Sequence, residues 1–363
     1  MKIAFRTDAS IQIGTGHVMR CLTLADALRL EGADCIFICR AHTGNLLDLI
    51  RQHGHQVVEL NYRESINTPS TTPVHAAWLG SDWATDASDT QKAIGSQPVD
   101  WLVADHYALD QRWEQSVRSY CQRLMVIDDL ADRPHDCDLL LDQNLGRIAE
   151  DYKQLIPSTA TVLIGPRYAL LRPEFSALRE ESLARRAKPQ LKHILITMGG
   201  VDKTNATGEV LNALRHSVLP QRLRITVVMG RHAPWLEHVK ATAQGMPYPT
   251  EVLVNVNHMA QLMTDSDLVI GAAGGTAWER CSLGIPSLVT PMAENQREGT
   301  EALQKSGATL TFHSSHDIPT LIESSLLSGK QPRLLKQLSV AAAAITNGNG
   351  AALVIQKLSN LHA

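Results

Sequence analysis

The sequence has few aromatic residues and no strong charge of either sign. Aromatic residues make up 4% of the 363 residues, and they do not interleave with basic clusters as a base-stacking surface requires. Lys and Arg number 34 against 37 Asp and Glu, so the formal charge is −3. This balance leaves no basic footprint for nucleic acid or for an anionic membrane. We therefore expect no nucleic-acid partner.

Signals for membrane insertion and export are also missing. No window approaches the roughly 18 uninterrupted apolar residues of a transmembrane helix. The opening MKIAFRTDAS lacks the apolar stretch of a signal peptide. The six cysteines include no C-x-x-C pair, which in a long chain is typical of reduced core residues rather than of a disulfide framework. The sequence predicts a cytoplasmic protein without membrane insertion.

The chain does contain a regular alternation of short apolar runs and segments of helical period. KIAFRTD reads as a strand, and Val18–Glu31 has apolar residues at helical spacing. Continuous apolar runs are typical of strands buried on both faces, and the alternation predicts a parallel sheet covered by helices. The pattern continues through CIFIC, a helical GNLLDLIRQHG, QVVEL, WLVAD, a helix over Trp113–Gln122, LMVIDD and DLLLD.

The pattern loosens between Glu150 and Leu191, and a second series of the same kind follows. At roughly 100–200 residues per domain, the length also suits two domains. We expect an α/β protein with two domains: an N-terminal Rossmann-like domain over 1–160, a linker region over 161–190, and a C-terminal Rossmann-like domain over 191–363, facing each other across a cleft. The second series contains HILITMGG, a helix over Asn205–Arg215, LRITVVMG, a helix over Pro234–Gln244, TEVLVNV, DLVIGAAGG, TAWERCSLG and PSLVTP.

The first candidate site segment is the loop GTGHVMR, between the first strand and its helix. Gly16 lets the backbone approach a ligand closely, and His17 opens the helix. The positive end of a helix disfavours imidazolium, so we expect a neutral ring that can accept a proton. A capping or packing histidine is the alternative. Arg20, one turn later, is a binding candidate or a helix-face arginine.

Two glycine-rich turns follow strands of the second series. Gly199 and Gly200 precede Asp202, which is either a binding residue or an ordinary turn or N-cap residue. The other turn has the geometry of a diphosphate site and leads into a helix, where a carboxylate at Glu279 could accept from ribose hydroxyls. The alternative is a T-x-x-E capping box, in which Thr276 and Glu279 cap the start of the helix. The residues of this turn are Gly274, Gly275, Thr276 and Glu279.

A run of three hydrogen-bonding side chains follows the strand PSLVT: Glu294, Asn295 and Gln296. Such side chains suit sugar hydroxyls and amides, and a polar helix start is the alternative. Asp105-His106-Tyr107 and Asp128-Asp129 end strands of the first series. No H-E-x-x-H motif, P-loop or G-x-S-x-G elbow occurs. The sequence predicts neither a metal nor a cofactor.

Together these segments resemble one family. FRTDASIQIGTGHVMRCLTLADAL, IGPRYALLRPEF, ITMGGVDKTN, AAGGTAWERCSLGIPSL and MAENQ are similar to the UDP-2,4-diacetamido-2,4,6-trideoxy-β-L-altropyranose hydrolases of pseudaminic acid biosynthesis. The resemblance, over residues 1 to 310, implies a GT-B fold like that of the transferase forming lipid II. It also implies metal-independent removal of UDP with inversion at C1.

The same resemblance assigns roles to individual residues. It implies that His17 is the general base and that Gly274, Gly275 and Thr276 hold the diphosphate. Glu279 matches the ribose-binding carboxylate. Glu294, Asn295 and Gln296 match the sugar-contacting motif, and Tyr107 matches a tyrosine near the sugar. The stretch 61–98 is longer and more polar than the family leads us to expect, and we assign no site there.

Two other functions remain open at this point. One is a GT-B glycosyltransferase that passes a UDP-linked amino sugar to an acceptor, and the other is a non-catalytic nucleotide-sugar-binding module. We expect a monomer whose partner is a small UDP-sugar. The product's destination, flagellin or a surface polysaccharide, is left open by the sequence.

Overall fold

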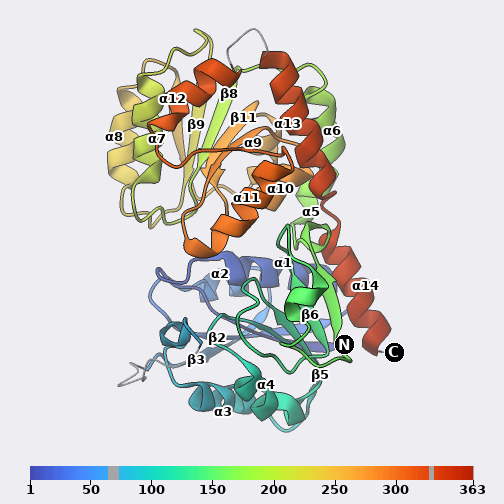
Figure 1. Ribbon diagram of the computed structural model, residues 1–363. Coiled ribbons are helices and arrows are strands. Elements are labelled where there is room, and N and C mark those ends of the chain that lie inside the picture. The colour runs from blue at the N-terminus through green and yellow to red at the C-terminus, as the bar shows by residue number, and fades with distance from the viewer. Residues whose placement is uncertain (64–72, 327–330, 363) are drawn as a thin grey trace. The chain divides into compact units, whose positions relative to one another are not determined.

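The computed structural model describes residues 1–63, 73–326 and 331–362, and they form two compact units. The N-terminal unit comprises Met1–Leu170 together with Gly350–Ala363, and the C-terminal unit comprises Leu171–Asn349. Each unit has a parallel sheet with its own core (Figure 1).

The N-terminal unit is a seven-stranded parallel sheet in the order β3-β2-β1-β4-β5-β6-β7. Its strands are β1 (Lys2–Thr7), β2 (Asp34–Arg40), β3 (Gln56–Leu60), β4 (Val99–Asp105), β5 (Cys121–Ile127), β6 (Leu139–Asp142) and β7 (Thr161–Ile164). Its α-helices are α1 (Gly16–Leu30), α2 (Leu47–Gln52), α3 (Trp83–Ile94), α4 (Gln111–Val117) and α14 (Gly350–His362). Short 3₁₀ helices are η1 (Ala76–Leu79), η2 (Arg118–Tyr120), η3 (Ala149–Tyr152) and η4 (Pro166–Tyr168).

Alternate side chains of each strand enter opposite layers of this unit, as the pleat requires. Ile3 and Phe5 pack in the layer of α1, α2 and α14. Ala4 packs in the layer of α3 and α4, where Trp113 is fully buried. Because both faces are covered, the strands read as continuous apolar runs.

The C-terminal unit is a six-stranded parallel sheet in the order β10-β9-β8-β11-β12-β13. Its strands are β8 (His193–Thr197), β9 (Arg224–Met229), β10 (Thr250–Val254), β11 (Leu268–Ala272), β12 (Ser287–Thr290) and β13 (Leu310–Thr311). Its helices are α5 (Pro173–Ala177), α6 (Arg179–Arg185), α7 (Ala206–Arg215), α8 (Leu236–Gln244), α9 (Met259–Thr264), α10 (Thr276–Ser282), α11 (Arg297–Lys305), α12 (Asp317–Thr320) and α13 (Gln331–Ile345), with η5 (Glu294–Gln296) and a π-helical turn, η6 (Leu321–Leu326).

Each strand order reverses direction once, and this reversal marks where a ligand site belongs. In the N-terminal unit the order turns between β1 and β4, and in the C-terminal unit between β8 and β11. At such a switch point the loops that follow two neighbouring strands diverge and leave a crevice at the carboxyl edge. The candidate segments after these strands therefore lie at the expected place in each unit.

The structure divides the chain differently from the expected boundaries of 160 and 190. Residues 161–164 are not linker but β7, which pairs with β6, and α6 already belongs to the C-terminal unit. The last helix, α14, belongs to the N-terminal unit because Val354 and Leu358 are fully buried in its core. The helix expected over Trp113–Gln122 ends at Val117, since Cys121 already pairs with Val99 in the sheet.

One stretch in the described residues, Arg333–His362, is long and apolar enough to cross a membrane by length and composition, although 44% of its most apolar window is buried. This finding departs from the expectation that no such stretch exists. The expectation concerned an uninterrupted apolar run, whereas a mean hydropathy over 18 residues tolerates polar positions within the run. The stretch is divided into α13 and α14 by the non-helical residues 346–349. Leu335 and Val354 pack in the cores of the two different units.

Candidate functional site

The loop that precedes α1 is shaped by its own hydrogen bonds. The Ser10 hydroxyl accepts from the amides of Gln12 and Ile13 at 3.1 and 2.8 Å. Gly14 adopts a φ of +84°, a conformation that favours glycine. This turn brings Gly16 and His17 to the start of α1, where no side chain caps the free amides.

His17 forms a dyad with Asp105, which ends β4. The two atoms His17 Nδ1 and Asp105 Oδ1 are 2.6 Å apart, and both side chains are buried. The register of the sheet brings the two residues together: Asp105 pairs with Thr7, the last residue of β1, and His17 lies at the start of the helix that follows β1. An ionised carboxylate only accepts hydrogen bonds, so this short contact assigns the proton to Nδ1 in preference to the longer, 3.3 Å approach of Arg20 Nη2 to the same atom. The lone pair of His17 then lies on Nε2, which has no hydrogen-bond partner among the described residues.

Arg20 holds the carboxylate of this dyad in place. Its Nε and Nη2 donate to the two oxygens of Asp105 at 2.6 Å each, and its Nη1 donates to Asp129 at 2.6 Å. Burial opposes ionisation of Asp105, but Arg20 and His17 hold its pKa well below the usual range. Likewise burial lowers the pKa of Arg20, while Asp105 and Asp129 raise it well above its ordinary value. Both groups are therefore ionised, and Arg20 positions Asp105.

Tyr107 packs beside the dyad. Its ring meets the His17 ring edge-on, with centroids 4.5 Å apart and planes at 85°. Its hydroxyl donates to Asp129 at 2.9 Å, and only 7% of the residue is exposed. The structure thus brings together three of the predicted residues, His17, Arg20 and Tyr107. Asp105 and Asp129, which the sequence singles out only as strand ends, join them.

In the C-terminal unit, the loop after β8 is held against the end of β9. Gly199 has a φ of +92°, and a Cβ at Gly230 would overlap the Gly200 carbonyl oxygen. Gly230 is therefore required for this close approach, a role that the sequence did not reveal. Asp202 is buried and its carboxylate accepts from the amides of Ala206 and Thr207 at 2.8 and 2.9 Å. Its oxygens cap α7, so the capping interpretation holds for Asp202.

The glycine-rich turn after β11 leads into α10 without a capping box. Thr276 is the first residue of the helix rather than its N-cap, and no side chain caps it. The Thr276 hydroxyl instead accepts from Arg280 Nη1 at 3.1 Å. The amide of Ala277 donates to the Gly274 carbonyl at 2.8 Å. It is thus occupied within the turn, which leaves the amides of Gly275 and Thr276 for a ligand.

Arg280 is the residue of this turn that sequence reasoning missed. It is almost fully buried, and its Nη2 donates to the Ala272 carbonyl at 2.8 Å. Burial lowers its pKa to about 10, so it remains a cation near neutral pH. Together with its bond to Thr276, this guanidinium fixes both ends of the turn. A charged residue inside a helix pattern was the only available signal.

Glu279 lies one turn into α10 in an environment that disfavours its charge. Burial raises the pKa of Glu279 to about 7, and Arg172 opposes this shift. Arg172 Nη2 lies 3.9 Å from Glu279 Oε1. The carboxyl group therefore titrates near neutral pH, and a ligand that donates hydrogen bonds to it would favour the ionised form.

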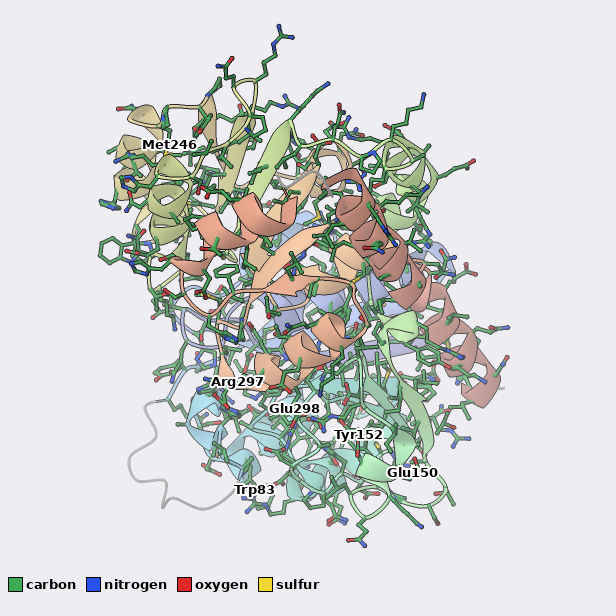
Figure 2. All side chains as sticks on the ribbon, turned by 45° about the horizontal axis from the view of Figure 1, so that its top comes forward. Trp83, Glu150, Tyr152, Met246, Arg297 and Glu298 are labelled. Carbon is green, nitrogen blue, oxygen red and sulfur yellow. The ribbon has the colours of Figure 1, made fainter. Side chains whose placement is uncertain are left out.

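The predicted sugar motif forms the 3₁₀ turn η5. Gln296 accepts from the Met292 amide at 2.8 Å and lies beside the glycine turn, since a Cβ at Gly274 would be 3.5 Å from its Nε2. Glu294 is exposed and pairs with Arg297 at 2.7 Å. Arg297 lies at the start of α11 (Figure 2). The side chain of Asn295 lies outside the described residues.

Comparison with known proteins shows which fold the chain has. Residues 193–358 match the model of the glycosyltransferase family 28 C-terminal domain. The structure of MurG from Acinetobacter baumannii superimposes with a TM-score of 0.70 at 16% identity, covering 99% of both chains. The chain is therefore an α/β protein with the GT-B fold.

Three curated relatives are similar to this chain over most of its length. The chain is 26% identical to the UDP-2,4-diacetamido-2,4,6-trideoxy-β-L-altropyranose hydrolase of Campylobacter jejuni, over 86% of this chain and 99% of the relative. It is 28% identical to the spore coat polysaccharide biosynthesis protein SpsG of Bacillus subtilis, over 88% of this chain and 86% of the relative. An uncharacterized Methanocaldococcus jannaschii protein is 27% identical over 82% of this chain, and the chain spans 57% of its length. The family resemblance seen in the sequence is confirmed.

Proposed function

We propose that the chain hydrolyses a UDP-sugar of the UDP-2,4-diacetamido-2,4,6-trideoxy-β-L-altropyranose type. The observation that carries the proposal is the 2.6 Å contact between His17 Nδ1 and Asp105, which directs the ring's lone pair to Nε2. A base held in one tautomer by a buried carboxylate is the arrangement that activates a water molecule. The similarity to the Campylobacter hydrolase supports the same activity.

In this proposal, His17 is the base of a single displacement. A water oxygen attacks C1 of the sugar while His17 Nε2 takes the water's proton. The bond between C1 and the diphosphate oxygen breaks, and UDP leaves with the electron pair. Attack opposite the leaving group inverts C1 and forms no covalent intermediate. UDP is a good leaving group, so no strong general acid is needed.

The C-terminal unit is proposed to hold the nucleotide. The free amides of Gly275 and Thr276 would stabilise charge on the diphosphate as it develops. Glu279 would accept from the ribose hydroxyls, and Gln296 and Glu294 would contact the sugar. For Arg20, whose guanidinium is bound to two carboxylates, we propose that it positions Asp105. For Asp202, whose carboxylate caps α7, we propose that it shapes the loop after β8.

A glycosyltransferase is the second candidate, because the matching family model is that of glycosyltransferases. Incubation with the UDP-sugar in EDTA-containing buffer separates the two. Release of UDP and free sugar without any acceptor supports the hydrolase. Release that requires an added acceptor would replace it with the transferase, and tight UDP binding without any turnover would favour a binding module.

The affinity for UDP is expected to depend on pH through Glu279. Its pKa of about 7 means that the ionised carboxylate, the stronger hydrogen-bond acceptor, is the minority form at about pH 6, so UDP binds more weakly there. We expect the Kd for UDP to fall about five- to tenfold between pH 6 and pH 8. Glu279→Gln should weaken binding about tenfold and lose this dependence.

Isothermal titration of both proteins at three pH values measures this effect. The variant also serves as the control for ionisation of UDP itself, since any pH dependence of the Kd that remains in Glu279→Gln comes from the ligand. An equal pH dependence of the Kd in the two proteins would show that Glu279 does not contact the nucleotide.

A further inference from the structure

The stretch 61–98, to which no function was assigned from the sequence, places aromatic side chains beside the His17 dyad. The rings of His75 and Trp78 pack against each other with centroids 4.3 Å apart and planes tilted by 41°. Both lie against Tyr107, at 5.4 and 6.0 Å between centroids. Tyr107 in turn meets the ring of His17. We call His75 and Trp78 the aromatic wall.

The aromatic wall is anchored by the turn that carries it. Leu79, at the end of η1, is buried in the core layer of α3 and α4. Gly80 follows with a φ of +65°, and a Cβ there would lie 2.8 Å from the Tyr62 ring and 2.9 Å from the His42 ring. Inside the turn, the Trp78 amide donates to the His75 carbonyl at 2.8 Å. The wall is thus fixed to the N-terminal unit by packing at the C-terminal end of η1.

The two rings of the wall retain accessible surface that Tyr107 lacks. His75 and Trp78 are half-buried, whereas Tyr107 is buried and its hydroxyl is bonded to Asp129. Burial lowers the pKa of His75, with further lowering by Arg133 and His17 against the influence of Asp132. The His75 ring is therefore neutral near pH 7 and presents an aromatic surface rather than a charge.

We propose that His75 and Trp78 contact the apolar face of the substrate's sugar and determine which nucleotide sugar is accepted. This inference rests on the proposed function, because it takes His17 as the base that acts at C1. Aromatic rings provide large, rigid contact area at small entropic cost. A pyranose with a deoxy methyl group and acetamido methyl groups offers apolar surface that matches such a wall. A sugar that carries hydroxyl groups at these positions would pay to bury them.

The test compares the affinity for UDP with that for UDP-2,4-diacetamido-2,4,6-trideoxy-β-L-altrose by isothermal titration. It uses the His17→Ala background, in which the sugar nucleotide persists. Trp78→Ala should weaken binding of the UDP-sugar by about ten- to a hundredfold, the range that apolar contacts in a pocket supply. The Kd for UDP should stay within about twofold. His75→Ala should act in the same direction with a smaller effect.

Trp83→Ala is the matched control. Trp83 is half-buried at the start of α3 and packs on Arg112 (Figure 2), so its loss should leave both affinities unchanged. Trp78→Leu keeps apolar volume but no ring, and it is expected to show most of the loss if Trp78→Ala does not fold. In the protein that retains His17, kcat/KM of Trp78→Ala should fall through KM rather than kcat.

Two results would overturn the proposal for the aromatic wall: an unchanged ratio of the two affinities in Trp78→Ala, which includes equal weakening of both ligands, or a parent protein that binds UDP and the UDP-sugar equally. Failure of the proposed hydrolase is seen separately, as absence of UDP release by the wild-type chain. The ratio of the two affinities tests the proposal for the aromatic wall whether or not the wild-type chain releases UDP.

Discussion

His17→Ala is expected to lower kcat by about 10²–10⁴-fold, the usual contribution of a positioned general base. The variant removes Nε2, the atom that takes the proton from water in the proposed displacement. It leaves the bonds between Arg20 and Asp105 in place. The nucleotide is proposed to bind the C-terminal unit, so the Kd for UDP should change by less than about twofold. Steady-state UDP release and titration with UDP measure the two quantities.

His53→Ala is the control for this prediction. His53 is also on the N-terminal unit and also contacts an aspartate, with its Nδ1 2.8 Å from Asp26, but 38% of its side chain is exposed. We expect wild-type turnover from it. A His17→Ala protein that turns over within a few-fold of wild type would remove His17 as the base, whatever its affinity for UDP.

Asp105→Asn is expected to reduce kcat by about 10³–10⁴-fold with little change in KM, in analogy to the carboxylate of a catalytic triad. The asparagine amide can donate to His17 Nδ1, which moves the ring proton to Nε2 and leaves no acceptor for water. The substitution also removes one of the two carboxylates that neutralise Arg20. Breaking a buried ion pair in this way costs about 3–5 kcal/mol of unfolding free energy.

Asp129→Asn separates these two effects. It removes a carboxylate partner of Arg20 and of Tyr107, but no contact with His17. We expect a loss of stability of the same kind as in Asp105→Asn and a much smaller loss of kcat. Denaturant unfolding and UDP release are measured on both variants. If kcat falls equally in the two, the role of Asp105 is structural rather than the orientation of His17.

The strands and most helices could be predicted because their signal is local. Runs such as LVIGA in β11 are apolar on both faces, and this reflects their burial in a covered parallel sheet. The order of these elements also predicted two Rossmann-like domains, and the family resemblance carried by the motifs implied the GT-B fold. The place of α14 was not, since its partner in the N-terminal core lies more than 300 residues earlier in the chain, at α1. The early end of α4 at Val117 reflects strand pairing of Cys121, which helical periodicity does not reveal.

The site shows the same division between local and tertiary information. His17 could be found because a glycine-rich loop at a helix start is visible in the sequence. Its partner Asp105 could not be assigned, because their contact depends on β4 lying next to β1 in the sheet. At α10 the local pattern T-x-x-E predicted a capping box, but Arg280 binds the Thr276 hydroxyl instead. Part of the polar stretch 61–98, residues 64–72, lies outside the described residues.

The central claim is that water attacks C1 of the sugar. The most direct test is a single turnover of the UDP-sugar in ¹⁸O-labelled water, with mass spectrometry of both products. The account predicts one labelled oxygen in the C1 hydroxyl of the free sugar and none in UDP. Label in the β-phosphate of UDP would mean attack at phosphorus and would contradict the proposed mechanism.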